Sequence, residues 1–314
     1  MLASEDRATV NKVWSGQVPT CFKLAEQDCG RLEAPDPFYI MLPRISYLPF
    51  FWEKVQNHFS RYVASEYRDS QLWLETPVDP ASVLSGSVSL RWHLPIGVLY
   101  DLHGGRTLPW TIIVHFRDFP EKELIPCPSK QVAEAYFMNS VKEADFLKTR
   151  KKVMTAMTQS ERRQMTASLY SLQAETFWAV NRKLMFMSES WKHIPLRVFL
   201  SQPPTDSSSV QPTVEQLQKL VPISGPCGLT STDGESEPLT LRQVLLQWLQ
   251  KYHSANGKLD DSQEMKHVWE EDMEVILHGI HAPLDVPLSW LSVNMSYADN
   301  FLYVVVRKKK ARES

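Results

Sequence analysis

Glycine is scarce in this sequence, and cysteine is sparse and irregularly spaced. The 314 residues include 11 glycines, and none forms the glycine-rich loop of a P-loop or dinucleotide-binding site, so nucleotide binding is not expected. The four cysteines contain no Cys-x-x-Cys pair, which argues against a zinc site or a disulfide framework. The sequence also has no apolar run of membrane-spanning length and no apolar signal core near residue 1. We therefore expect a reduced, cytoplasmic protein without a metal or cofactor.

An excess of charge of one sign is absent as well. The formal net charge is −2, so the overall charge balance does not attract nucleic acid. A hydrophobic fraction of 43% and ten tryptophans are typical of packed globular domains. Because 314 residues exceed what one hydrophobic core usually supports, we expect two or three domains.

The first part of the chain alternates between strand-like and helix-like hydrophobic patterns. The pattern predicts two strands, a helix, two strands, a short helix and a final strand, which matches the β-grasp architecture of ubiquitin, a mixed sheet wrapped on one helix. The predicted ranges are 18–24, 38–42, 47–63, 72–75, 88–93, 95–102 and 110–116.

Nearly the same order returns after a helical stretch at 118–193, for which we expect about three helices. The second set lacks one strand of the first, and in both sets a short helix that starts after a proline precedes the last strand. Its predicted ranges are 194–200, 213–221, 239–252, 274–278, 287–293 and 301–307. The repetition indicates two degenerate copies of one fold.

We therefore predict an α+β fold in which two ubiquitin-like β-grasp domains flank a helix-rich domain. The predicted division is an N-terminal helix at 1–15, a first ubiquitin-like domain at 16–120, a helix-rich domain at 121–193 and a second ubiquitin-like domain at 194–314. Residues 203–212 and 253–271 are polar, charged or rich in Ser and Pro and are expected to be loops.

A short amphipathic helix is predicted at 3–14, with Ser4 as its N-cap. It is too short to be stable alone, so its apolar side, which carries Val10 and Trp14, must dock on the chain's own domains or on a partner helix. Arg44 and Tyr47 lie at the junction of a strand and the main helix of the first domain. These four residues are candidates for a partner groove, and ordinary core or interdomain packing is the alternative.

The longest helical pattern begins near Lys130, after two prolines, with Ser129 as the expected N-cap. Ala133, Phe137, Val141, Ala144 and then Leu147 or Lys148 recur at core spacing. A neighbouring stripe places Lys142 between Met138 and Phe146. On spacing alone, the simplest interpretation of Lys142 is a surface lysine that pairs with Asp145.

Catalytic signals are weak. Cys127 lies between two prolines with no nearby histidine to activate it, so an inert thiol is favoured over a thiol hydrolase. His278 and His281 are not accompanied by further metal ligands, which favours structural roles. The basic C-terminal tail after Val306 can either meet anionic lipid or keep an edge strand solvated.

Several long strings resemble the autophagy protein 5 family over nearly the whole chain. They include rare tryptophans, which makes the match specific. The strings are VWSGQVPTCF (13–22), LPRISYLPF (42–50), LRWHLPIGVLYDL (90–102), LPWTIIVHFRDFPEKELIPCPSK (108–130), EAYFMNSVKEADFLK (134–148), FWAVNRKLM (177–185), IPLRVF (194–199) and PLSWLSVNMSYADNFLYV (287–304). The loops at 203–212, 222–238 and 253–272 look longer than the family's core.

The resemblance implies two ubiquitin-like domains beside a helix-rich one, and a protein that is not itself an enzyme. It further implies that one lysine accepts autophagy protein 12, a ubiquitin-like modifier, through an isopeptide bond; in the string NSVKEADFLK that residue is Lys142. Glu134, Met138 and Phe146 are then candidates for contact with the modifier or with the conjugating enzyme. Lys148 and Lys151 are the next acceptor candidates.

The resemblance also implies a groove that holds a helix of autophagy protein 16, with Val10, Trp14, Arg44 and Tyr47 as candidate contacts. The assembled complex is expected to act like a ligase. It promotes transfer of autophagy protein 8 to lipid at the phagophore membrane, with which it associates peripherally. An unconjugated adaptor for membranes or proteins is the alternative.

Overall fold

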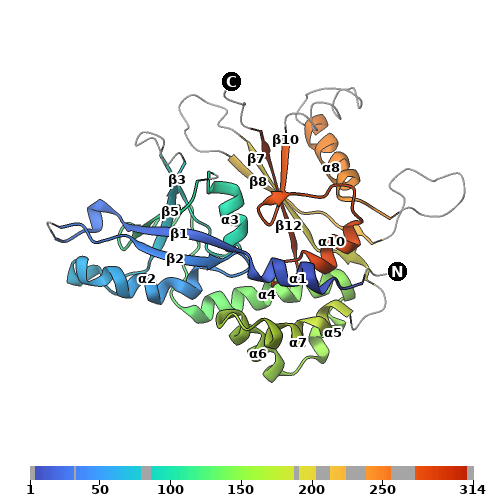
Figure 1. Cartoon of the computed structure of the whole chain (residues 1–314), viewed down its shortest axis with the longest axis horizontal. Coiled ribbons are helices and arrows are strands. Elements are labelled where there is room, and N and C mark those ends of the chain that lie inside the picture. The colour runs from blue at the N-terminus through green and yellow to red at the C-terminus, as the bar shows by residue number, and fades with distance from the viewer. Residues whose placement is uncertain are drawn as a thin grey trace, which may run out of the picture.

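The computed structural model describes residues 4–31, 33–78, 86–105, 107–186, 191–202, 213–223, 238–255 and 273–309. Two β-sheets stand beside each other, and a layer of helices lies across their common end (Figure 1). The predicted loop at 203–212, most of the one at 253–271 and the end of the basic tail lie outside the described residues.

The first sheet has the strand order β2-β1-β5-β3-β4. Strands β1 and β5 are parallel, and the other neighbours are antiparallel. The strands are β1 (Gln17–Leu24), β2 (Phe38–Pro43), β3 (Trp73–Pro77), β4 (Ser87–Ser89) and β5 (Trp110–His115). The helices are η1 (Glu26–Asp28), η2 (Leu48–Phe51), α2 (Trp52–Phe59), η3 (Ser60–Tyr62), η4 (Ser65–Tyr67) and α3 (Ile96–His103). The helix predicted at 47–63 is thus an α-helix with a 3₁₀ turn at each end.

The second sheet repeats the first. Its order is β11-β10-β12-β7-β8, and its first and last long strands, β7 and β12, are again parallel neighbours. Its elements are β7 (Leu196–Gln202), β8 (Thr213–Leu217), α8 (Leu241–Ala255), β10 (Met273–Leu277), β11 (Ile280–His281), α10 (Leu288–Asn294) and β12 (Leu302–Lys308). A small separate pair joins β6 (His193–Ile194) to β9 (Val221–Pro222). The predicted internal repeat is confirmed by this strand order, while the exact domain boundaries stay predictions.

The helical layer contains α4 (Lys130–Thr149), α5 (Lys152–Ala156), α6 (Gln159–Tyr170) and α7 (Ala174–Phe186). Helix α4 begins at Lys130, as predicted, although the side chain of Ser129 makes no capping hydrogen bond. It ends where Arg150 and Lys151 adopt left-handed backbone angles, with φ of 62° and 69°, and the short α5 follows. None of the described helices is long and apolar enough to cross a membrane.

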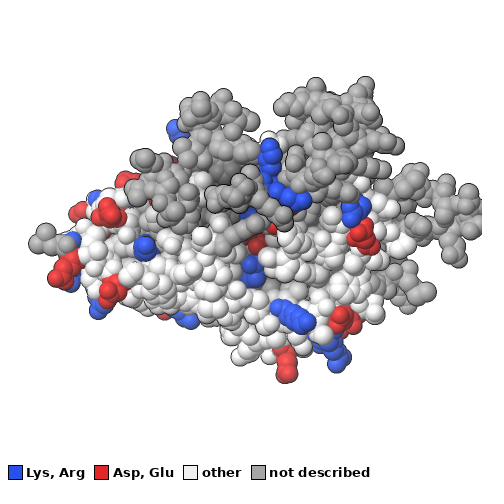
Figure 2. All heavy atoms as spheres, turned by 45° about the horizontal axis from the view of Figure 1, so that its top comes forward, with Lys and Arg blue, Asp and Glu red and all other residues white. Residues whose placement is uncertain are grey.

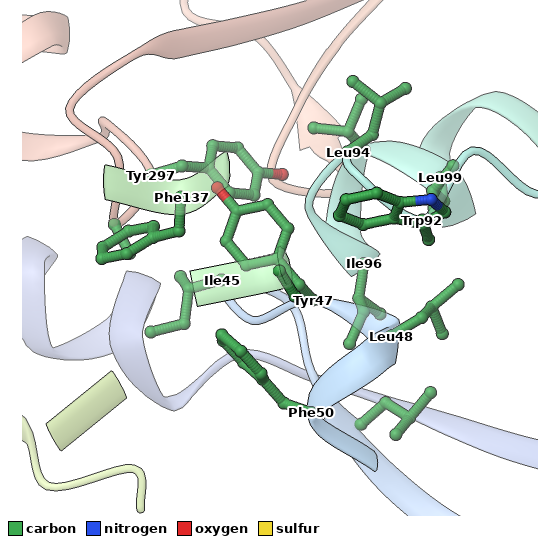
Figure 3. Packing of buried hydrophobic residues seen from close by; sticks show 14 of the residues in the cluster. Ile45, Tyr47, Leu48, Phe50, Trp92, Leu94, Ile96, Leu99, Phe137 and Tyr297 are labelled. Atoms are coloured by element: carbon green, nitrogen blue, oxygen red, sulfur yellow. The ribbon is translucent and has the colours of Figure 1, made fainter. Parts of the chain in front are cut away.

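The main hydrophobic core joins all three parts of the chain. Tyr47, after the first hairpin, lies between Phe137 of α4 and Tyr297 of the loop before β12 (Figure 3). The ring centroids of Tyr47 and Phe137 are 6.0 Å apart. Large aromatic side chains at such a junction contribute most of the buried apolar area, so the sheets and the helical layer hold one another in place.

The N-terminal helix α1 (Arg7–Ser15) starts later than predicted. Asp6, and not Ser4, is its N-cap, because the Asp6 carboxylate accepts hydrogen bonds from the backbone N–H groups of Ala8 and Thr9. The start of the helix is fixed by Asn294 of α10, whose side-chain oxygen accepts from the Asp6 N–H at 2.6 Å.

Candidate functional site

Helix α4 presents one exposed lysine in its middle. Lys142 is exposed, and its Nζ donates to Asn139 Oδ1 on the same helix at 3.3 Å. The pairing of Lys142 with Asp145 is wrong. Asp145 is 1% exposed, and its carboxylate accepts from Thr149 Oγ1 at 2.5 Å and from the N–H of Met154 at 2.8 Å. Lys142 therefore projects from a well-anchored helix, and no acidic side chain in the described part of the chain forms an ion pair with it.

Apolar surface lies next to Lys142. Phe146, one turn later, is 40% exposed, and the Arg150 guanidinium lies 5.0 Å from its ring centroid. Met138, one turn earlier, is partly buried against the main core. Glu134, further back on this side, forms an ion pair with Lys130 at 3.7 Å. An exposed aromatic ring beside an exposed amine suits contact with another protein.

Lys148 is excluded as an acceptor by its burial. It is 1% exposed, its Nζ donates to Met185 Sδ at 3.0 Å, and it lies 4.2 Å from the ring centroid of Trp191. Burial lowers the pKa of this amine to about 7, although Asp145 and Asp299 act in the opposite direction. The core spacing of α4 already allowed an inward Lys148. Lys151 is exposed.

A buried polar network joins α4 to the second sheet. Arg197 of β7 donates to Glu143 Oε2 of α4 at 2.7 Å and to the hydroxyl of Tyr303 at 2.9 Å. The hydroxyls of Tyr303 and Tyr47 both donate to Asp299 Oδ2, at 2.6 Å and 3.2 Å.

Burial shifts the titration of this network. Burial raises the pKa of Asp299, against the opposing effect of Arg197 and the two tyrosine hydroxyls. Burial acts to lower the pKa of Arg197, but Tyr303, Asp299 and Glu143 outweigh it and raise that pKa. Arg197 therefore stays charged at neutral pH. The sequence patterns did not single out Glu143 or Arg197, because their partners are far away along the chain.

The four candidates for a partner groove are placed differently from one another. Val10 and Tyr47 are each 3% exposed and Arg44 is 7% exposed, so these three side chains lie inside the chain and do not line an open surface. Arg44 Nη2 pairs with Asp101 Oδ1 at 2.5 Å. Trp14 is partly exposed, and its ring centroid lies 5.0 Å from that of Phe177 in α7. The contact of these residues with a partner helix stays a prediction.

Cys127 and His278, two candidates for catalysis or metal binding, are buried and partly buried, respectively. Cys127 is 1% exposed, and burial raises the pKa of its thiol to about 11, so it carries almost no thiolate at neutral pH. Burial lowers the pKa of His278 to about 3, which keeps that ring neutral. Within the described residues, no group of three or more His, Cys, Asp or Glu side chains could hold a metal ion.

Charge is spread thinly over the described part of the face drawn in Figure 2. On the face drawn in Figure 2, basic and acidic side chains lie scattered among uncharged atoms, and their signs are mixed. A field of one sign that would attract nucleic acid does not cover the described part of this face.

Comparison with known families places each part of the chain. Three family models match: "Autophagy protein ATG5, UblA domain" at residues 13–116, "Autophagy protein ATG5, alpha-helical bundle region" at 130–187 and "Autophagy protein ATG5, UblB domain" at 193–306. The first and third correspond to the two sheets with their helices, and the second to α4 through α7.

Full-length relatives support the same assignment. "Autophagy protein 5" of Drosophila melanogaster is 33% identical, with 98% of this chain and 99% of the relative covered. "Autophagy-related protein 5" of Caenorhabditis elegans is 31% identical, with 96% and 98% covered. The crystal structure of Kluyveromyces marxianus Atg5 superposes with a TM-score of 0.69 at 18% identity and covers 96% of this chain and 99% of that one. The structural match supports the fold.

Proposed function

Since this chain belongs to the autophagy protein 5 family, we propose that it is a scaffold that is joined covalently through Lys142 to the ubiquitin-like autophagy protein 12. It is an autophagy protein with two ubiquitin-like domains, and its proposed role is that of a non-catalytic subunit. The observation that carries the proposal is the exposed Lys142 amine in the middle of the anchored helix α4.

The site suits an acceptor amine. In the proposed step, the nitrogen of Lys142 attacks the thioester carbonyl carbon at the C-terminus of the modifier, which the conjugating enzyme carries on a cysteine. The carbon–nitrogen bond forms, the carbon–sulfur bond breaks, and the departing sulfur takes up a proton that the amine gives off. The product is an amide and a free enzyme thiol, so no oxidant or cofactor is required.

The surroundings of Lys142 support contact with two further proteins. Phe146 offers an exposed apolar surface on which the modifier can rest after the bond forms. Met138 and Glu134 extend the same side of α4 toward its start, where they can contact the modifier or the conjugating enzyme. We regard these three residues as contact candidates for autophagy protein 12.

The proposed complex also includes autophagy protein 16, bound as a helix beside α1. Trp14 is the candidate contact with exposed surface, and the buried Val10, Arg44 and Tyr47 stay the other candidates. In this proposal the assembly promotes lipidation of autophagy protein 8, in the manner of a ligase. The chain itself is cytoplasmic and is recruited peripherally to the phagophore membrane.

The test is the intact mass of the chain after reaction with the activating enzyme, the conjugating enzyme and autophagy protein 12. Wild type, Lys142→Arg and Lys151→Arg are compared, since Lys151 is an exposed lysine near the end of the same helix. A single adduct is expected in wild type and Lys151→Arg and none in Lys142→Arg. An adduct that persists in Lys142→Arg would show that another lysine is the acceptor. The absence of an adduct in wild type would favour the alternative, an unconjugated adaptor.

A further inference from the structure

The residue that follows Lys142 is tied to the second sheet by a closed set of hydrogen bonds. Arg197 Nη2 donates to Glu143 Oε2 at 2.7 Å, and Gln218 Nε2 donates to Glu143 Oε1 at 2.7 Å. Arg197 Nε in turn donates to Gln218 Oε1 at 3.1 Å. Both carboxylate oxygens of Glu143 are therefore engaged by the second ubiquitin-like part.

Arg197 is itself held firmly. Its guanidinium carbon lies 3.7 Å from the ring centroid of Phe301, Nη1 donates to Tyr303, and its side chain is 9% exposed. A planar guanidinium with several fixed hydrogen bonds sets the direction as well as the distance of a partner carboxylate. Glu143 is thus held by a donor that belongs to the second sheet and has its own contacts there.

Among the residues that the structure describes, no comparable anchor holds the side chain of Lys142. Its described hydrogen bond is to Asn139 of the same helix, so the place of the amine is set by the backbone of α4. Core side chains such as Val141 and Ala144 hold one side of this turn. Glu143 ties the same turn to the second sheet through Arg197 and Gln218.

We propose that Glu143 and Arg197 are positioning residues for amide formation at Lys142. Their ion pair keeps the helical turn that carries the acceptor in one place relative to the second ubiquitin-like part, so a docked conjugating enzyme meets the amine at a constant position. The inference rests on the proposed function, because only an acceptor has to be positioned. Attack requires the reacting atoms to lie about 3–3.5 Å apart, and a displacement of about 1 Å can slow a reaction about a hundredfold.

The experiment is single-turnover transfer of the modifier from pre-charged conjugating enzyme to the full-length chain, at increasing enzyme concentration. Glu143→Ala is expected to lower the maximal rate about tenfold and to leave the half-saturating enzyme concentration unchanged. Glu143→Gln keeps an accepting oxygen and should recover part of the rate. Arg197→Lys keeps the charge beside Asp299 but loses the planar guanidinium group and its several donors. When it is combined with Glu143→Ala, the two losses of maximal rate should not add, because both changes break one interaction.

A matched control removes another arginine–carboxylate pair far from α4. Asp285→Ala breaks the bond between Arg242 Nε and Asp285 Oδ1, which is 2.6 Å long, and should leave the transfer rate unchanged. Thermal unfolding of each variant identifies any loss of folded protein. If Arg197→Lys does not fold, the two variants of Glu143, a side chain that is 43% exposed, decide the question.

Two results would overturn the inference. One is an unchanged maximal rate in Glu143→Ala. The other is a raised half-saturating concentration in Glu143→Ala together with a normal Arg197→Lys, which would mean that Glu143 contacts the enzyme directly. Failure of the proposed function is distinct, because wild type would then form no adduct or Lys142→Arg would still form one.

Discussion

The side-chain amine of Lys148 lies 3.0 Å from the sulfur of Met185, whereas Lys142 of the same helix projects into solvent. The two side chains are chemically identical and lie on one helix, yet their surroundings differ. Lys148 also lies 4.2 Å from the ring centroid of Trp191, at the start of the segment that leads into the second sheet. Under the proposed function, α4 offers Lys142 and not Lys148 for modification, because a buried amine cannot meet a conjugating enzyme.

Replacing Lys148 with methionine should stabilise the protein in a pH-dependent way. The unfolded chain holds the Lys148 proton up to the ordinary pKa of 10.5, but the folded chain releases it at about 7. Between these values unfolding takes up a proton, so the free energy of unfolding of wild type rises with pH.

The gain from Lys148→Met should therefore be largest below pH 7, on the order of a few kcal/mol, and should shrink toward pH 10. Urea unfolding at pH 6, 7.5 and 9 measures it, with the exposed Lys142→Met as the control, which should show no such trend. A gain in the free energy of unfolding that does not change with pH would contradict the lowered pKa of the Lys148 amine.

Tyr47→Phe tests the buried network around Asp299. The variant removes the hydroxyl that donates to Asp299 Oδ2 at 3.2 Å but keeps the ring beside Phe137. Because Tyr303 still donates to the same oxygen, the free energy of unfolding should fall by about 1–2 kcal/mol. Tyr47→Ala also removes the ring and should cost about 3–5 kcal/mol. Chemical denaturation separates the two, and equal losses would show that the hydroxyl carries the whole effect.

Trp14→Ala should loosen α1 without releasing its start. The Trp14 ring lies 5.0 Å from that of Phe177 and 6.4 Å from that of Trp178. Loss of this partly buried ring should cost about 1–3 kcal/mol. The first turn stays anchored, since Arg182 Nη2 pairs with Glu5 at 3.0 Å.

Hydrogen exchange of the α1 amides measures the effect of Trp14→Ala, with the exposed Lys12→Ala as its control. Under the proposed function, Trp14→Ala also weakens binding of the autophagy protein 16 helix. Unchanged exchange together with unchanged binding would remove Trp14 from both roles.

Cys127→Ser should leave adduct formation unchanged, because burial raises the pKa of the Cys127 thiol to about 11 and leaves it protonated at neutral pH. In wild type, a thiol-specific alkylating reagent should label the partly exposed Cys29 well before Cys127, as mass spectrometry of peptides would reveal. Loss of adduct formation in a folded Cys127→Ser variant would instead support a catalytic role for the Cys127 thiol.

Much of the architecture could be predicted from local patterns. The order of strands and helices predicted two copies of one fold, and both sheets have the corresponding strand order. The prolines before Ser129 and the unbroken apolar spacing after it predicted where α4 begins. Lys142 could be singled out because it lies beside the core face and because its surroundings resemble a family motif. These features depend on neighbours close in the sequence, which is why the sequence by itself determined them.

The partners across the interfaces were decided by the tertiary structure. Spacing allowed either Leu147 or Lys148 to face inward, and only the packing of Met185 and Trp191 around the amine selected Lys148. Glu143 looked like an ordinary polar position until the fold brought Arg197 to it. The free energy of a buried charge depends on the groups that surround it, and those groups come from segments far apart in the chain, so no local pattern could reveal them.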